Sequence, residues 1–132
     1  MIYLDNAATS FPKPECVYDA VDLYNRQNGR AVGRGTSDAG QQLQQIVNRC
    51  RFRAAQVLGA SANEEIVFTL NCTDSLNMII HGLLKPGDHV VTSVAEHNSV
   101  LRPLRHLEAN RDVTLTLVDV DDAGFFDAAD VE

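Results

Sequence analysis

Two short segments carry the side chains best suited to chemistry, and the first is 69–74 (TLNCTD). Here a predicted strand turns into a predicted helix. The first backbone N–H groups of a helix lack intrahelical partners and carry the positive end of its dipole, so they can bind a phosphate. The Thr73 hydroxyl adds a donor. No glycine-rich phosphate motif is present, and the alternative is that Asn71 or Thr73 is simply an N-cap.

The second segment is 95–99 (AEHNS), directly after the next predicted strand. In open α/β sheets, ligands bind at the carboxyl ends of the strands, so we expect His97 and the turn at Thr73 to share one edge of a sheet. An imidazole at that edge can stack on an aromatic ligand or transfer protons near neutral pH. The alternative is that His97 belongs to a capping loop at a helix start.

A glycine-rich segment, 29–37 (GRAVGRGTS), holds two further candidates. The guanidinium groups of Arg30 and Arg34 could bind a carboxylate or a phosphate. The alternative is a flexible loop that faces solvent.

The cysteines and the other histidines carry weaker signals. The chain has three cysteines, Cys16, Cys50 and Cys72. Their odd number and the lack of a CxxC motif indicate neither a disulfide framework nor a zinc site. Cys50 lies on the apolar stripe of a predicted helix, so we expect it in the core. Structural or solvent-facing roles are expected for His81, His89 and His106.

The elements that must position these residues follow from hydrophobic periodicity and turn residues. Helices are predicted at 14–28, 38–58, 73–84 and 99–110, and strands at 65–69, 89–93 and 113–118. Pro103 requires the last helix to start late or to kink early. Strands that alternate with helices and are apolar on both faces predict a parallel sheet between helices, with right-handed crossovers.

The domain organisation is predicted in two parts. Residues 1–37 form an extended segment, a helix and the glycine and arginine loop, and residues 38–132 form an incomplete α/β domain. Three parallel strands make a thin sheet with open edges, and another helix begins within the acidic tail 119–132. We therefore interpret the chain as part of a larger domain; the alternative is a frayed acidic terminus on a small complete fold.

The composition excludes several classes of protein. Of the 132 residues, 45% are hydrophobic and 22% are charged, as in a globular protein. The net charge of −7 is opposite to the basic surplus of a nucleic-acid binder. The apolar runs are too short to span a membrane, and residues 1–5 lack the features of a signal peptide, so we expect a cytoplasmic protein.

Taken in order, the motifs resemble the amino-terminal part of the class V aminotransferase-like enzymes that use pyridoxal 5'-phosphate (PLP). Within that family, the sequence is most similar to the cysteine desulfurase and selenocysteine lyase branch. The segments that carry the resemblance are 3–9 (YLDNAAT), 33–35 (GRG), 66–69 (IVFT) with Thr73, Asp74 and Asn77, and 96–99 (EHNS).

The resemblance implies an α/β fold: part of a PLP-transferase large domain at residues 38–132, with a mostly parallel sheet flanked by helices after an extended amino-terminal segment. It implies that Thr73, with the backbone of Cys72, holds the phosphate of PLP. It also implies that His97 stacks on the pyridine ring as a catalytic residue. The family usually has a small residue at the position of Cys72 and a glutamate at the position of Asp74.

Further roles also follow from the resemblance. Asn6 and Ala7 would line the substrate side of the pocket, and Arg34 would face the active site of a dimer mate. The family forms homodimers with a large PLP domain and a smaller domain. A histidine often stands in the family where Gly33 stands here.

The function that the resemblance implies is sulfur abstraction from L-cysteine, giving alanine and an enzyme persulfide. The small amino-acid substrate that it implies is L-cysteine or selenocysteine. The lysine that holds PLP lies beyond residue 132 in the family, and neither Lys13 nor Lys85 fits its motif. We therefore expect this chain to be inactive alone. A homodimer or a complementing chain is expected as its partner. The alternatives are another class V enzyme (an aminotransferase, an epimerase or a kynureninase-type hydrolase) and a non-catalytic remnant or interaction module.

Overall fold

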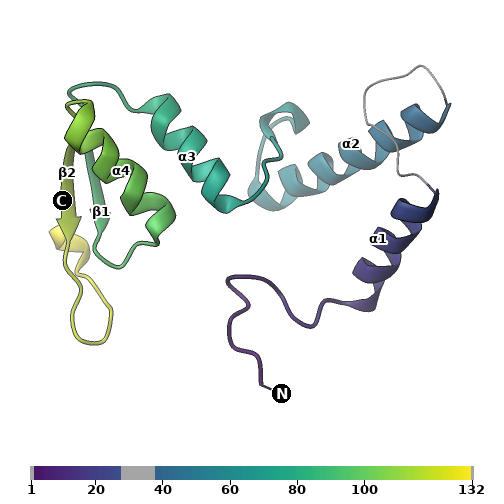
Figure 1. Ribbon diagram of the computed structural model, residues 1–132, viewed down its shortest axis with the longest axis horizontal. Helices are drawn as coiled ribbons and strands as arrows, with labels where there is room; N and C mark the ends of the chain where they lie inside the picture. Colours follow the sequence, from purple (N-terminus) through teal and green to yellow (C-terminus); the bar gives the residue numbers. More distant parts are fainter. Residues whose placement is uncertain (1, 28–37, 132) are drawn as a thin grey trace. The chain divides into compact units, whose positions relative to one another are not determined.

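The computed structural model describes residues 2–27 and 38–131. The elements are α1 (Glu15–Gln27), α2 (Asp38–Leu58), the 3-10 turn η1 (Asn63–Glu65), α3 (Cys72–Leu83), β1 (His89–Ser93), α4 (Asn98–Asn110), β2 (Thr114–Val118) and the 3-10 turn η2 (Ala128–Asp130) (Figure 1). The chain forms two compact units, Met1–Val67 and Phe68–Glu132. The domain division predicted at residue 37 falls next to the undescribed segment and stays a prediction.

In the amino-terminal unit, α2 has the bounds that the sequence predicts. Gly59 follows the last residue of the helix with a φ of +69°, a conformation that glycine adopts without steric cost. The Ala60 N–H then donates to the Ala55 carbonyl over 3.0 Å. Leu43 and Ala55 of this helix are buried. The prediction that Cys50 lies in the core is wrong, because its side chain is exposed. The element that packs against α2 is η1, which follows the end of that helix, whereas Cys50 lies in the middle of α2.

The strand predicted at residues 65–69 is not formed, and this prediction is wrong. Glu65 ends η1, and Ile66 has extended dihedral angles, φ −92° and ψ 113°. A strand also needs a neighbour whose backbone groups complete the hydrogen-bond ladder. The sheet in the described part of the chain contains two strands, β1 and β2, so residues 66–69 are not part of a sheet there. β-Branched and aromatic residues favour an extended backbone, but a strand also requires a neighbouring strand, which local sequence does not provide.

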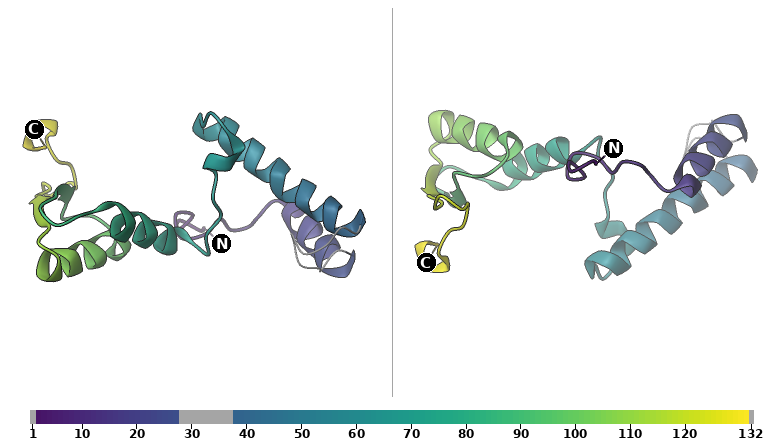
Figure 2. Two further views of the ribbon diagram at one scale, coloured as in Figure 1. Left: turned by 90° about the horizontal axis from the view of Figure 1, so that it is seen from above. Right: turned by 90° about the horizontal axis from the view of Figure 1, so that it is seen from below.

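In the carboxyl-terminal unit, β1 and β2 pair in parallel, as predicted, in a register that runs from His89 opposite Thr114 to Ser93 opposite Val118. Parallel neighbours need a crossover connection, and α4 provides it. Figures 1 and 2 show α4 next to α3 and covering one side of the strand pair, with the segment after β2 on the other side. The right-handed sense of the crossover stays a prediction.

The core of this unit lies between α4 and the strands. Its buried residues are Ser99, Pro103, Leu104 and Leu107 of α4, with Val113 and Val118. Of the two effects expected of Pro103, the late start does not occur, because α4 begins at Asn98 and continues through the proline. An early kink stays a prediction. Proline removes one intrahelical hydrogen bond, that to the carbonyl four residues earlier. The Pro103 side chain is buried in the core, and this burial offsets part of the lost hydrogen bond.

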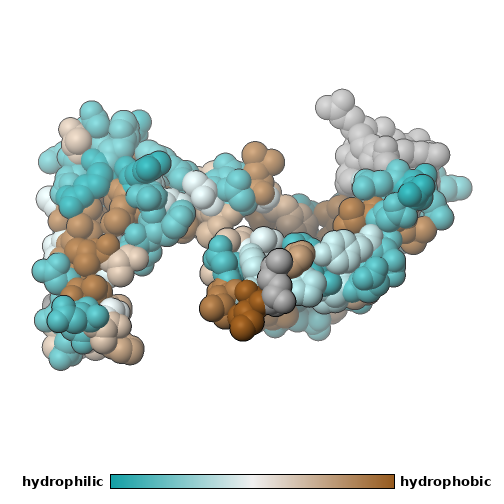
Figure 3. All heavy atoms as spheres, turned by 60° about the horizontal axis from the view of Figure 1, so that its bottom comes forward, coloured by the Kyte–Doolittle hydropathy of each residue, from teal (hydrophilic) through white to brown (hydrophobic). Residues whose placement is uncertain are grey.

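Apolar side chains also reach the surface of this unit (Figure 3). On the side away from α4, Val91, Phe126 and Val131 line a hollow of about 270 Å³, and Phe126 is 55% exposed. None of the helices in residues 2–27 and 38–131 is long and apolar enough to cross a membrane.

The core assignment predicts a large effect for Leu107→Ala. Leu107 is 1% exposed, so truncation should lower the free energy of unfolding of the carboxyl-terminal unit by about 2–5 kcal/mol. Leu83→Ala is the matched control, because Leu83 is 69% exposed and should lose much less. Urea titration followed by the amide NMR signals of β1, β2 and α4 measures both. Equal effects of the two substitutions would contradict this core.

Candidate functional site

Two side-chain-to-backbone hydrogen bonds hold the amino-terminal end of α3. Asn71 is the N-cap, and its Oδ1 accepts from the Asp74 N–H over 2.9 Å. The Asp74 carboxylate in turn accepts from the Leu70 N–H over 3.3 Å. The hydroxyls of Thr69 and Ser75 are also hydrogen-bonded to each other. These contacts fix the backbone of the turn before any ligand is present.

This cap leaves the first turn of α3 partly open. In the described part of the chain, the backbone N–H groups of Cys72 and Thr73 donate no hydrogen bond. The capping role considered for Asn71 is therefore correct, and it coexists with two free donors. Together with the Thr73 hydroxyl, these donors and the helix dipole can bind an anion.

His97 is the N-cap of α4, and its ring is held from one side. Nδ1 accepts from the Ser99 N–H over 3.1 Å and lies 2.8 Å from the Ser99 Oγ. The ring is otherwise exposed. His97 thus also caps a helix, as the alternative interpretation stated, and the imidazole remains accessible to a ligand.

Thr73 and His97 line one cleft of about 460 Å³ in the carboxyl-terminal unit. The structure therefore brings together the two segments expected at one edge of the sheet. The cleft lies where α3 and α4 pack against each other. Its walls are Thr73, Asn77, His81, His97, Asn98, Ser99, Arg102, Pro103 and His106.

The charge of this cleft is opposite to that of the chain. The whole sequence has a net charge of −7, yet none of the side chains that line the cleft is a carboxylate. Arg102 lines it, and no carboxylate in the described part of the chain forms an ion pair with this arginine. The neighbouring Arg105, in contrast, is paired with Glu108 at 2.7 Å. The cleft is therefore suited to an anionic ligand.

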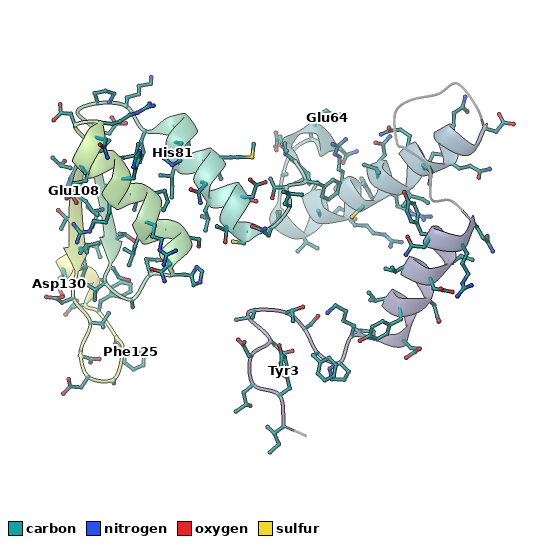
Figure 4. The ribbon with its side chains drawn as sticks, in the orientation of Figure 1. Tyr3, Glu64, His81, Glu108, Phe125 and Asp130 are labelled. Carbon is teal, nitrogen blue, oxygen red and sulfur yellow. The ribbon has the colours of Figure 1, made fainter. Side chains whose placement is uncertain are left out.

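Sequence reasoning missed three residues of this cleft: His81, Arg102 and His106. The rings of His81 and His106 meet edge to face, with their centroids 6.0 Å apart, and His81 lies on the side of α3 that faces α4 (Figure 4). The available signal was spacing, because these residues follow Thr73 and Asn98 at multiples of four and so share their helix faces. No group of three or more metal-ligating side chains occurs among residues 2–27 and 38–131.

The remaining predicted site residues lie elsewhere in the chain. Asn6 and Ala7 belong to an exposed turn of the amino-terminal unit, where the Asn6 Oδ1 accepts from the Phe11 N–H over 3.2 Å. The nearby Tyr3 hydroxyl lies 2.9 Å from the carbonyl oxygen of Thr9 (Figure 4). Arg34, like Arg30, lies outside the described residues. The roles of all these residues stay predictions.

Comparison with known proteins points to one family. A family profile described as "Aminotransferase class-V" matches residues 2–132. A probable cysteine desulfurase of Pyrococcus abyssi is 38% identical over 136 residues, covering 100% of this chain and 33% of that protein. The cysteine desulfurase of Haloferax volcanii is 38% identical over 133 residues, covering 96% of this chain and 31% of that protein.

A solved structure supports the same grouping. The cysteine desulfurase from Thermococcus onnurineus NA1 matches with a TM-score of 0.86 at 36% identity, over 98% of this chain and 32% of that one. The chain thus spans about a third of the length of the relatives that it matches.

The geometry predicts where an anion binds. On titration with inorganic phosphate, the amide NMR signals of Cys72 and Thr73 should shift more than that of Asp74, whose N–H already donates to Asn71. Arg102→Ala should weaken phosphate binding about two- to fivefold, the effect of one exposed charge. Arg105→Ala is the control, because Arg105 does not line the cleft. An equal loss in both variants would contradict a local role for Arg102.

Proposed function

The chain belongs to the class V aminotransferase family, and we propose that it forms the cofactor-binding part of a PLP-dependent cysteine desulfurase. The observation that carries this proposal is that Thr73 and His97 line one cleft beside the free N–H groups of Cys72 and Thr73. The cysteine desulfurase relatives support the choice of this branch over the other class V reactions.

The donors in the cleft fit the two chemical parts of PLP. We assign its phosphate to the backbone N–H groups of Cys72 and Thr73, the Thr73 hydroxyl and the guanidinium of Arg102. We assign its pyridine ring to the exposed imidazole of His97, because flat aromatic rings attract each other by offset stacking. The absence of carboxylates among the lining side chains favours the anionic cofactor.

The cofactor, when bound, withdraws electrons from the Cα of an amino acid. Residues of this chain would hold it and prepare the site. The helix dipole of α3 and the charge of Arg102 stabilise the phosphate, and His97 covers the ring and offers a proton at Nε2. On the substrate side, we assign Asn6, Ala7 and Arg34 to the binding of the amino acid.

The proposed reaction moves one sulfur atom. L-Cysteine and an enzyme thiol give L-alanine and an enzyme persulfide, and selenocysteine would react analogously. We do not assign the lysine that binds PLP covalently to this chain. Lys13 Nζ donates to Thr9 Oγ1 and to the Ser10 carbonyl, and Lys85 does not line the cleft. We therefore propose that a complementing chain supplies this lysine, because a homodimer mate would carry only the same two lysines.

We also propose that the protein works in the cytoplasm. The three cysteines are free and exposed, which suits a reducing compartment, where thiols stay reduced.

Binding of PLP to the purified chain tests the proposal. We expect saturable, reversible binding, weakened about two- to tenfold by His97→Ala or Thr73→Ala, the effect of one stacking contact or one hydrogen bond. After borohydride reduction, intact mass should show no covalent adduct. His89→Ala is the control, because His89 bonds Thr116 on the sheet and does not line the cleft.

Two results would count against the proposal. The absence of saturable binding would remove the cofactor from this cleft. A stoichiometric reduced adduct on Lys13 or Lys85 would instead show that this chain supplies its own covalent lysine.

A further inference from the structure

Ser99 is an unusual member of the core. It is 7% exposed, whereas the other buried residues in the described part of the chain, such as Leu104 and Leu107, are apolar. A buried hydroxyl is costly unless it forms a hydrogen bond. The Ser99 Oγ lies 2.8 Å from His97 Nδ1, so its burial is coupled to the imidazole.

The backbone of Ser99 binds the same ring atom. The Ser99 N–H donates to His97 Nδ1 over 3.1 Å, and a ring nitrogen that accepts an N–H holds no proton. In the neutral ring, the proton is therefore on Nε2. Rotation of the ring by 180° would replace Nδ1 with a C–H group and break both contacts with Ser99. Two donors from one buried residue thus set both the orientation and the tautomer of His97.

The other histidines of the cleft lack such an anchor. The Nδ1 atom of His106 lies 3.4 Å from the Asn110 side-chain amide nitrogen, and the ring of His81 contacts that of His106 edge to face. Ser99 packs one turn before the buried Pro103 on the core face of α4. The ring of His97 is therefore attached to the core, although its accessible surface lines the cleft.

We infer that Ser99 is a positioning residue, which holds the ring of His97 ready to stack on the cofactor. This inference rests on the proposed function. A ring that is already oriented loses less conformational freedom on binding, so the anchor should strengthen cofactor affinity without touching the cofactor.

The tautomer of His97 can be measured in the chain without cofactor. Long-range ¹H–¹⁵N NMR should show His97 with its proton on Nε2. Ser99→Ala keeps the backbone N–H at 3.1 Å but loses the closer hydroxyl at 2.8 Å, so a measurable fraction of the other tautomer should appear. The same variant should weaken PLP binding about two- to tenfold, the effect of one hydrogen bond. Ser99→Cys keeps nearly the same volume with a weaker donor and should give intermediate values. Ser61→Ala, in the other unit, is the control for loss of a hydroxyl and should leave both quantities unchanged.

The outcomes separate this inference from the proposed function. Unchanged tautomer and affinity in Ser99→Ala and Ser99→Cys would overturn the positioning role. If Ser99→Ala loses the signals of α4, the Ser99→Cys spectrum decides. If the His97 tautomer changes in the Ser99 variants but neither they nor the parent chain bind PLP, the contact between Ser99 and His97 is supported and the cofactor assignment is wrong.

Discussion

The parallel pairing of β1 with β2 is the constraint on which the carboxyl-terminal unit depends. Parallel strands need a crossover, and α4 lies over the strands and buries Leu104 and Leu107 beside Val113 and Val118. The start of α4 is thereby fixed just beyond the carboxyl end of β1. With that placement, His97 lines the same cleft as Thr73 of α3.

Two helix caps of different chemistry then define the site. Asn71 caps α3 by occupying the N–H of Asp74, and this leaves the earlier donors of that helix open. His97 caps α4 with a ring nitrogen and leaves the rest of the ring open. In each case, the interaction that caps the start of the helix also leaves one surface open to a ligand. Local backbone requirements and the binding chemistry are therefore satisfied by the same side chains.

The sequence predicted what depends on local periodicity. The long helix α2 and the strands β1 and β2 follow from their apolar patterns. Thr73 and His97 do line one cleft, but not for the expected reason, because the strand expected before Thr73 is not formed and the cleft lies where α3 packs against α4. Features that depend on a distant partner were missed. Residues 66–69 have strand-forming side chains but join no sheet in the described part of the chain, and the meeting of His81 with His106 depends on which faces of α3 and α4 pack together.

The capping role of His97 also limits how this position can evolve. Asparagine, aspartate, serine and threonine replace a cap well, but none of them has an aromatic face. Phenylalanine, tyrosine and tryptophan keep the face but have no acceptor that can take the Ser99 N–H in the same way. Histidine both caps the helix and has the aromatic face that the proposed stacking on the cofactor requires, so few substitutions at this position would keep both roles.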